Sequence, residues 1–299
     1  MQAPVLKYKN VITIITTNKK LLGNTLIFIS AILMALVGVF VKHLSGQIPA
    51  SYITFGRFFV GFMYIYIGRK FGKIDKTENN RKNLLIFAFF GAIAATSFFL
   101  AISTDTLGRA TLLNSLQPIF SAIFAMVLFK EKTPKLVWLF TGISFIGVYL
   151  VTSPDFSNIN IGMVYGLIAG IVAGLAIMYM NIARQTESAS ATFYYFCKIG
   201  MIFTFILCLK TPMLPPASAY LYLFIMGMIG TLSQLLITYA YKYTTPTEGG
   251  IVFMSQIFFA MLLGYAIFGE TLSFEGIIGA IMILLSGAFV TWLRRKPSV

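Results

Sequence analysis

Residues Ala110–Glu131 read ATLLNSLQPIFSAIFAMVLFKE, and the stretch 139 positions further along, 249–270, reads GGIVFMSQIFFAMLLGYAIFGE. The shift places Gln256 on Gln117 and Glu270 on Glu131. The same shift aligns further pairs along the chain, which are Gly23 with Gly162, Gly61 with Gly200, Gly91 with Gly230, Ala101 with Ala240 and Phe129 with Phe268. One constant offset without a gap predicts a tandem duplication.

The composition places both copies in a membrane. The 299 residues are 58% hydrophobic and only 11% charged, which excludes an ordinary soluble domain. A bilayer core of about 30 Å takes about 20 helical residues, and the chain has ten apolar runs of roughly that length. They are Leu21–Val41, Ser51–Gly68, Leu84–Ser103, Ala110–Phe129, Leu136–Val151, Gly162–Ile182, Ala191–Leu209, Ala217–Tyr241, Gly249–Phe268 and Phe274–Leu293.

Ten runs in two copies give five spans per copy. Because five is odd, the second copy must insert upside down, and many transporters are built from such an inverted repeat. We therefore predict an all-α integral membrane protein with ten transmembrane helices in two inverted five-helix repeats. The expected boundaries are a tail at 1–21, the first repeat at 22–155, the second at 156–293 and a basic tail at 294–299.

Charge placement predicts the orientation. Eighteen of the 23 Lys and Arg residues fall on the side that bears both termini, against only Lys42, Arg109 and Lys210 on the other. This asymmetry is typical of cytoplasmic loops, so we expect both termini in the cytoplasm and the chain in the inner (plasma) membrane. We attribute the net charge of +14 to topology and contact with anionic lipid headgroups, and expect no nucleic-acid partner.

Several kinds of chemistry have no signature in the sequence. There is no GxxxxGK[ST] loop for ATP and only one histidine, His43, so we expect no enzyme, catalytic residue, metal site or cofactor. All nine acidic residues fall in loops or at span ends, which argues against a proton relay through a buried carboxylate. Coupling through a rim group such as Glu270 stays open, as does the oligomeric state, a homodimer included.

Two cations lie inside predicted spans. Arg57 is six residues into the second span and Lys198 about seven into the seventh, so each is roughly 10 Å deep, from opposite faces. A charge at mid-helix costs about 2.5–3.5 kcal/mol on insertion, so it needs a reason. One interpretation is a cationic lining for an anionic group of the substrate. The alternative is that these side chains reach the membrane surface or bond to carbonyls of neighbouring spans.

Polar residues recur on the apolar helices. Asn114, Gln117 and Ser121 share one face of the fourth span, and Pro118 cannot donate to the carbonyl of Asn114, so the helix should bend there. The other polar candidates are Ser255 and Gln256 in the ninth span and Ser233, Gln234 and Thr238 in the eighth. Such groups either bond between helices or line a wet cavity, and we favour the cavity.

The sixth span has a glycine at every fourth position, including Gly166 and Gly170. This ridge predicts close approach of a neighbouring backbone, with a structural or gating role.

Residues Ala110–Glu131 resemble the signature of the drug/metabolite transporter superfamily, EamA-type, with an Ala-rich start, the mid-helix Pro118 and a closing Glu131. The second copy keeps Glu270 but has Ile257 where the proline stands. Arg57 resembles the arginine of the family's second span. Because an arginine shared by carriers of many substrates points to architecture, we favour a structural role for Arg57.

The resemblance implies ten helices, a central cavity lined by spans 1, 3, 4, 6, 8 and 9, and alternating access, with Tyr179 near the cavity. An apolar cavity with amides and cationic edges suits an amphipathic metabolite with a carboxylate, such as an amino acid. We predict a secondary transporter that exports such a compound. The alternatives are an uptake carrier for a nucleoside or vitamin, and a structural or sensory subunit without transport.

Overall fold

The computed structural model describes residues 3–72, 79–105, 107–130, 134–152, 160–213, 215–269 and 273–293, with the backbone alone described at 3–18, 107–109, 129, 268 and 293. The helices are α1 (Ala3–Ser45), α2 (Ala50–Lys70), α3 (Arg81–Thr104), α4 (Leu107–Asn114), α5 (Gln117–Phe129), α6 (Lys135–Thr152), α7 (Ile161–Thr186), α8 (Ala189–Cys208), α9 (Ala217–Ala240), α10 (Pro246–Phe253), α11 (Ser255–Phe268) and α12 (Phe274–Leu293). Because α4 with α5 and α10 with α11 each form one span, the described chain contains ten segments long and apolar enough to cross a membrane. The predicted ten-helix fold is confirmed.

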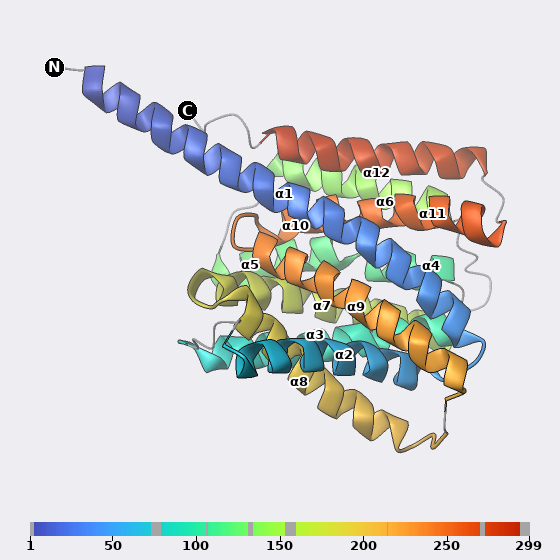
Figure 1. Ribbon diagram of the computed structural model, residues 1–299. Coiled ribbons are helices and arrows are strands. Elements are labelled where there is room, and N and C mark those ends of the chain that lie inside the picture. Colours follow the sequence, from blue (N-terminus) through green and yellow to red (C-terminus); the bar gives the residue numbers. More distant parts are fainter. Residues whose placement is uncertain are drawn as a thin grey trace.

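The helices form one bundle in which successive spans run in opposite directions (Figure 1). The start of α1 and the finish of α12 lie at the same end of the bundle, which we call the terminal end. The opposite end, where α1, α3 and α6 finish, is the distal end. These two names are used below because they assume no orientation in the membrane.

The first helix begins before the first span. Residues 1–21 were expected to form a tail; α1 is one continuous helix from Ala3 to Ser45, and its membrane-compatible part begins at Lys19. Its first part projects beyond the bundle at the terminal end (Figure 1). No Pro or Gly lies between Val5 and Leu22, so the sequence has nothing that stops the helix before the apolar run begins.

Two spans are broken near the middle of the membrane. The fourth is interrupted between Asn114 and Gln117, where Pro118 removes the donor for the carbonyl of Asn114, as the sequence predicted. The ninth breaks at Met254, the corresponding place in the second repeat, although it has Ile257 instead of proline. There the amide of Ile257 donates to the carbonyl of Met254 at 3.0 Å, an i to i−3 bond that tightens the turn.

The two broken spans touch at their breaks. A Cβ added to Gly250 in α10 would lie 2.8 Å from Cγ of Pro118 in α5, so only glycine permits this contact. The two interruptions are therefore neighbours in the centre of the bundle, where each can expose backbone polar groups to a shared space.

The glycine ridge of α7 packs against the broken fourth span, as predicted. Gly166 and Gly170 face Leu113, and a Cβ on Gly170 would collide with the carbonyl oxygen of that residue. A Cβ on Gly174 would lie 2.7 Å from Cβ of Phe120. Backbone therefore packs on backbone at the crossing, the arrangement that small residues allow in membrane helices.

The repeat symmetry is visible where α2 crosses α8. Gly61 packs under Cys197 and Phe193, and its counterpart Gly200 packs under the ring of Phe58. Phe58 and Cys197 are themselves related by the shift of 139 positions, so the crossing joins two equivalent surfaces. This is the contact expected between two inverted copies of one unit.

Candidate substrate cavity

A cavity of about 440 Å³ lies between the two repeats, within the usual size range of small-molecule sites. Most of its wall is apolar, from residues such as Met34, Val37, Phe98, Phe99 and Ile257. The polar lining consists of Ser30, Lys42, Arg57, Thr111, Asn114, Gln117, Thr152, Ser233, Gln234 and Gln256. A mostly apolar wall with a few convergent polar groups is the usual composition of a metabolite site.

The cavity extends to the distal end of the bundle. Its lining includes Lys42, Ile102 and Thr152, which lie within the last turn or so of α1, α3 and α6. Toward the terminal end the lining reaches Phe87 in α3, Met180 in α7 and Ile237 in α9. The lining therefore runs from the distal end of the bundle to a layer of apolar side chains nearer the terminal end.

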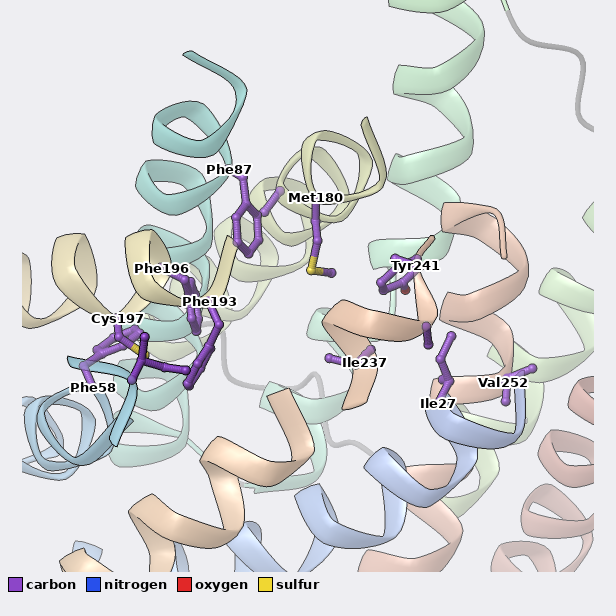
Figure 2. Packing of buried hydrophobic residues seen from close by; sticks show 13 residues of the cluster. Ile27, Phe58, Phe87, Met180, Phe193, Phe196, Cys197, Ile237, Tyr241 and Val252 are labelled. Atoms are coloured by element: carbon purple, nitrogen blue, oxygen red, sulfur yellow. The ribbon is translucent and has the colours of Figure 1, made fainter. Parts of the chain in front are cut away.

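Nearer the terminal end, the interior contains a cluster of large apolar side chains (Figure 2). Phe196 stacks on Phe87 with ring centroids 5.5 Å apart and contacts Phe58 edge-on at 5.0 Å. Met180 and Ile237 belong to the same cluster and to the cavity wall. This apolar layer lies between the polar lining of the cavity and the terminal end.

Arg57 is the cation at the centre of the site. Its side chain is 7% exposed, lines the cavity, and donates from Nη2 to Oε1 of Gln234 in α9 at 3.3 Å. The Arg57 side chain lies against Gly230 of α9, and a Cβ added to this glycine would lie 3.3 Å from the Nε of Arg57. Within the described lining the other cation is Lys42, and no carboxylate is present. The described lining therefore has two cationic residues and no acidic one, which favours a negatively charged ligand.

The predicted amides do meet in the cavity. Asn114 and Gln117 reach it from the two sides of the break in the fourth span, and Gln256 reaches it from the break in the ninth. Gln234 completes the group from α9. Gln117 is only 8% exposed, and an amide in such a place offers both a donor and an acceptor to a bound molecule.

Three other predicted residues lie away from the cavity lining. Ser121 is fully buried, and its hydroxyl donates to the carbonyl of Pro118 in its own helix at 2.9 Å. Thr238 is also fully buried, with its hydroxyl 3.6 Å from the sulfur of Met180. The ring of Tyr179 stacks on Phe90 outside the cavity wall.

Lys198 does not face the cavity either. It is exposed on the outside of α8, with Nζ 5.9 Å from the centre of the Tyr194 ring. The repeat shift relates Lys198 to Phe59, which is 42% exposed, whereas Arg57 is related to Phe196, a cavity residue. Two residues along a helix turn a side chain by about 200°, so Lys198 faces outward where Arg57 faces inward.

The residues that the sequence analysis assigned to structural or gating roles fall into two groups, those that pack between helices and those outside the described residues. Pro118, Gly166 and Gly170 hold the fourth span against α7 and α10, as described above. Glu131 and Glu270 lie outside the described residues. Among those that are described, no group of three His, Cys, Asp or Glu side chains could hold a metal ion.

Sequence reasoning missed several lining residues. Lys42 was placed just outside the first span, and Ser30 was not considered. The hydroxyls of Ser30 and of Ser233, a predicted polar residue of the eighth span, each donate to the other's carbonyl across α1 and α9 at 2.9 and 3.0 Å. Phe196 could have been found, because the repeat shift relates it to Arg57. Met180, Phe87 and the other apolar residues carry no signal of their own, since the same residue types fill the core.

The amides allow a direct test of the site. If the amides bind the cargo, Gln117→Leu or Gln256→Leu is expected to reduce transport about tenfold, because each would remove one hydrogen bond to it, while the melting temperature of the purified protein changes little. Transport assays and thermal unfolding measured on the same preparations check this. If each variant lost stability in step with transport, the amides would be holding helices together instead.

Comparison with known proteins identifies the fold and the general activity. The EamA-like transporter family matches residues 21–153 and again 160–292. An uncharacterized transporter of Archaeoglobus fulgidus is 28% identical over 90% of this chain and 96% of its own. The pseudopaline exporter of Pseudomonas aeruginosa is 21% identical over 88% and 94%. The S-adenosylmethionine uptake transporter of Rickettsia bellii is 22% identical over 85% and 88%.

A solved crystal structure has the same fold, with a TM-score of 0.74 over 92% of this chain and 99% of its own at 14% sequence identity. The matches to named transporters extend over nearly the whole of both chains, and the family matches each half of the chain separately. The chain is a multi-pass membrane transporter and belongs to the EamA-like transporter family, within the drug/metabolite transporter superfamily.

Proposed function

We propose that this transporter exports a small amphipathic metabolite with at least one carboxylate, an amino acid derivative or a related organic acid. The observation that carries the proposal is Arg57, a buried cation in the wall of a cavity whose described lining has no acidic residue. A carboxylate bound there would replace lost hydration with charge-assisted hydrogen bonds, which are about twice as strong as neutral ones.

The rest of the cavity fits the other parts of such a molecule. Phe98, Phe99 and Met34 provide apolar surface, and the amides at the two helix breaks provide donors and acceptors for neutral polar groups. The positive lining disfavours a cationic solute. It also disfavours a neutral one such as a nucleoside, because such a solute leaves the guanidinium without a counter-charge.

The excess of Lys and Arg on the terminal side supports a cytoplasmic location for both termini in the plasma membrane. The distal end then faces outward, and the cavity is in its outward-open state. A carrier that alternates between this state and an inward-open one would release its cargo on the side seen here.

A topology experiment checks this orientation. Single cysteines at Gln47 and Lys210, both exposed at the distal end, should react with an impermeant thiol reagent in intact cells, and cysteines at Lys82 and Lys242 should react only after the membrane is opened. The reverse pattern would show that the protein has the opposite orientation, and the state seen here would then be inward-open.

The names of the relatives include both directions of transport, since one is named an exporter and another an uptake transporter. Export is tested by comparing metabolites inside and outside cells that contain the protein with those of cells that lack it. A carboxylate compound that falls inside and rises outside supports export. The opposite change in the same compound supports uptake by the same site, and a neutral or cationic cargo overturns the proposed substrate class.

A further inference from the structure

Arg57 and Gln234 form one polar group in the cavity wall. The Arg57 side chain is 7% exposed, and its Nη2 donates to Oε1 of Gln234 in α9 at 3.3 Å. Among the described residues, Gln234 is the one hydrogen-bond partner of this guanidinium. Both residues line the cavity, so the remaining donors of Arg57 are available to a molecule bound there.

The chemistry of the pair fixes how the Gln234 amide is turned. A guanidinium has N–H donors and no acceptor, so the amide oxygen must face Arg57 and the amide nitrogen must face away from it. No described residue accepts a hydrogen bond from the Gln234 Nε2. Because Gln234 is a lining residue, its N–H donors add to those of Arg57 in the same part of the cavity.

The equivalent crossing in the other half of the molecule has neither the cation nor the amide. Arg57 and Gln234 meet where α2 crosses α9, and the repeat shift relates this place to the crossing of α8 with α3. There Phe196 stands in the position of Arg57, Gly91 in that of Gly230 and Ala95 in that of Gln234. The glycine keeps its role, since a Cβ on Gly91 would lie 2.9 Å from Cε2 of Phe196. The amide is therefore not a general requirement of the crossing, and it accompanies the arginine.

We propose that Gln234 sets the charge preference of the cavity by holding Arg57 without neutralising it. Its amide oxygen keeps the guanidinium in the wall, and its amide nitrogen donates to the same anionic group of the cargo. A glutamate would accept the same hydrogen bond, but its charge would form an ion pair with Arg57 and leave no net charge for the cargo. The inference rests on the proposed binding of an anionic group at Arg57, and it makes Gln234 the positioning residue of that site.

The experiment measures the charge preference of the cavity without any cargo. The purified full-length protein carries Cys197→Ala and Cys208→Ala, with Ala95→Cys in the cavity wall as the reporter. Its labelling rates are measured with two methanethiosulfonates of similar size, one bearing a sulfonate and the other a quaternary ammonium. The charge preference is the ratio of the anionic to the cationic rate, divided by the same ratio for a free thiol in solution. Differences in the access or reactivity of the reporter cancel in this ratio.

The unchanged reporter protein is expected to prefer the anionic reagent about tenfold, because one sign of charge in a cleft concentrates the opposite ion. Gln234→Leu should lower this preference about threefold through the loss of hydrogen bonds to the anion, and Gln234→Glu should abolish it. In the Arg57→Gln background, Gln234→Leu should have no further effect, since the amide acts through the cation. Gln185→Leu, at an exposed glutamine outside the cavity, is the matched control and should leave the preference unchanged.

A role of Gln234 in the fold alone would lower the yield of folded protein and leave the charge preference as it was. The inference is overturned if Gln234→Leu does not lower the preference, if it lowers it equally in both backgrounds, or if the Gln234→Glu protein still prefers the anionic reagent. Gln234→Glu keeps the side-chain length and the acceptor, so it supplies the test if Gln234→Leu does not fold. An unchanged protein without any preference for the anionic reagent would overturn the charged cavity of the proposed function, and this inference with it.

Discussion

Replacing Arg57 with glutamine is expected to lower transport of a carboxylate cargo by about tenfold to a hundredfold. A hydrogen bond to a charged group contributes about 1.5–3 kcal/mol, and Arg57 is the buried cation in the cavity wall. Arg57→Lys should give an intermediate rate, because it keeps the charge but loses the planar group that binds both carboxylate oxygens. Initial rates in proteoliposomes, with the amount of folded protein measured in each sample, check this.

The matched control is Lys198→Gln. This change also removes one cation, but Lys198 lies on α8, the helix that crosses α2, and its side chain is exposed on the outside of the bundle. Its transport rate should equal that of the unchanged protein. The assignment fails if Lys198→Gln impairs transport while a well-folded Arg57→Gln protein transports normally.

Gly170→Ala is expected to cause a large loss of folded protein. The new Cβ would collide with the carbonyl oxygen of Leu113, and this atom belongs to backbone that cannot rotate away. Overpacking of this kind typically costs about 1–3 kcal/mol and would push α7 away from the broken fourth span. Yield after extraction and the melting temperature in detergent measure the effect.

Gly142→Ala provides the comparison, because this glycine on α6 has no atom within 4 Å of an added Cβ. Alanine is the better helix former, so stability should be equal or slightly higher. Equal melting temperatures for the two variants would show that the close crossing of α7 is not required.

Much of the fold follows from simple features of the sequence. Run length and the shift of 139 positions predict the ten spans and the repeat, and Pro118 predicts the break in the fourth span. The break at Met254 has no nearby proline from which it could be predicted. The repeat itself could have indicated it, because a duplicated unit tends to keep its backbone path after the residue that caused it has changed.

The site was less predictable, because residue type alone does not say which way a side chain points. The four amides meet in the cavity, but the hydroxyls of Ser121 and Thr238 are satisfied within the protein interior. Short hydroxyl side chains can bond to their own helix, so they mark a cavity less reliably than amides. A structural role was favoured for Arg57 because it resembles an arginine of the family, and the role of Lys198 was left open; the structure places Arg57 in the cavity wall and Lys198 on the outside. The rotation of about 200° between their helical positions accounts for the difference.

The central claim is that a fixed cation in the cavity selects a negatively charged cargo. The most direct measurement compares initial transport rates in proteoliposomes for one carboxylate compound and its uncharged primary amide, which has almost the same shape. We predict that the carboxylate is transported at least tenfold faster, and that this preference disappears in the Arg57→Gln protein. Equal transport of the two compounds by the unchanged protein would contradict the account.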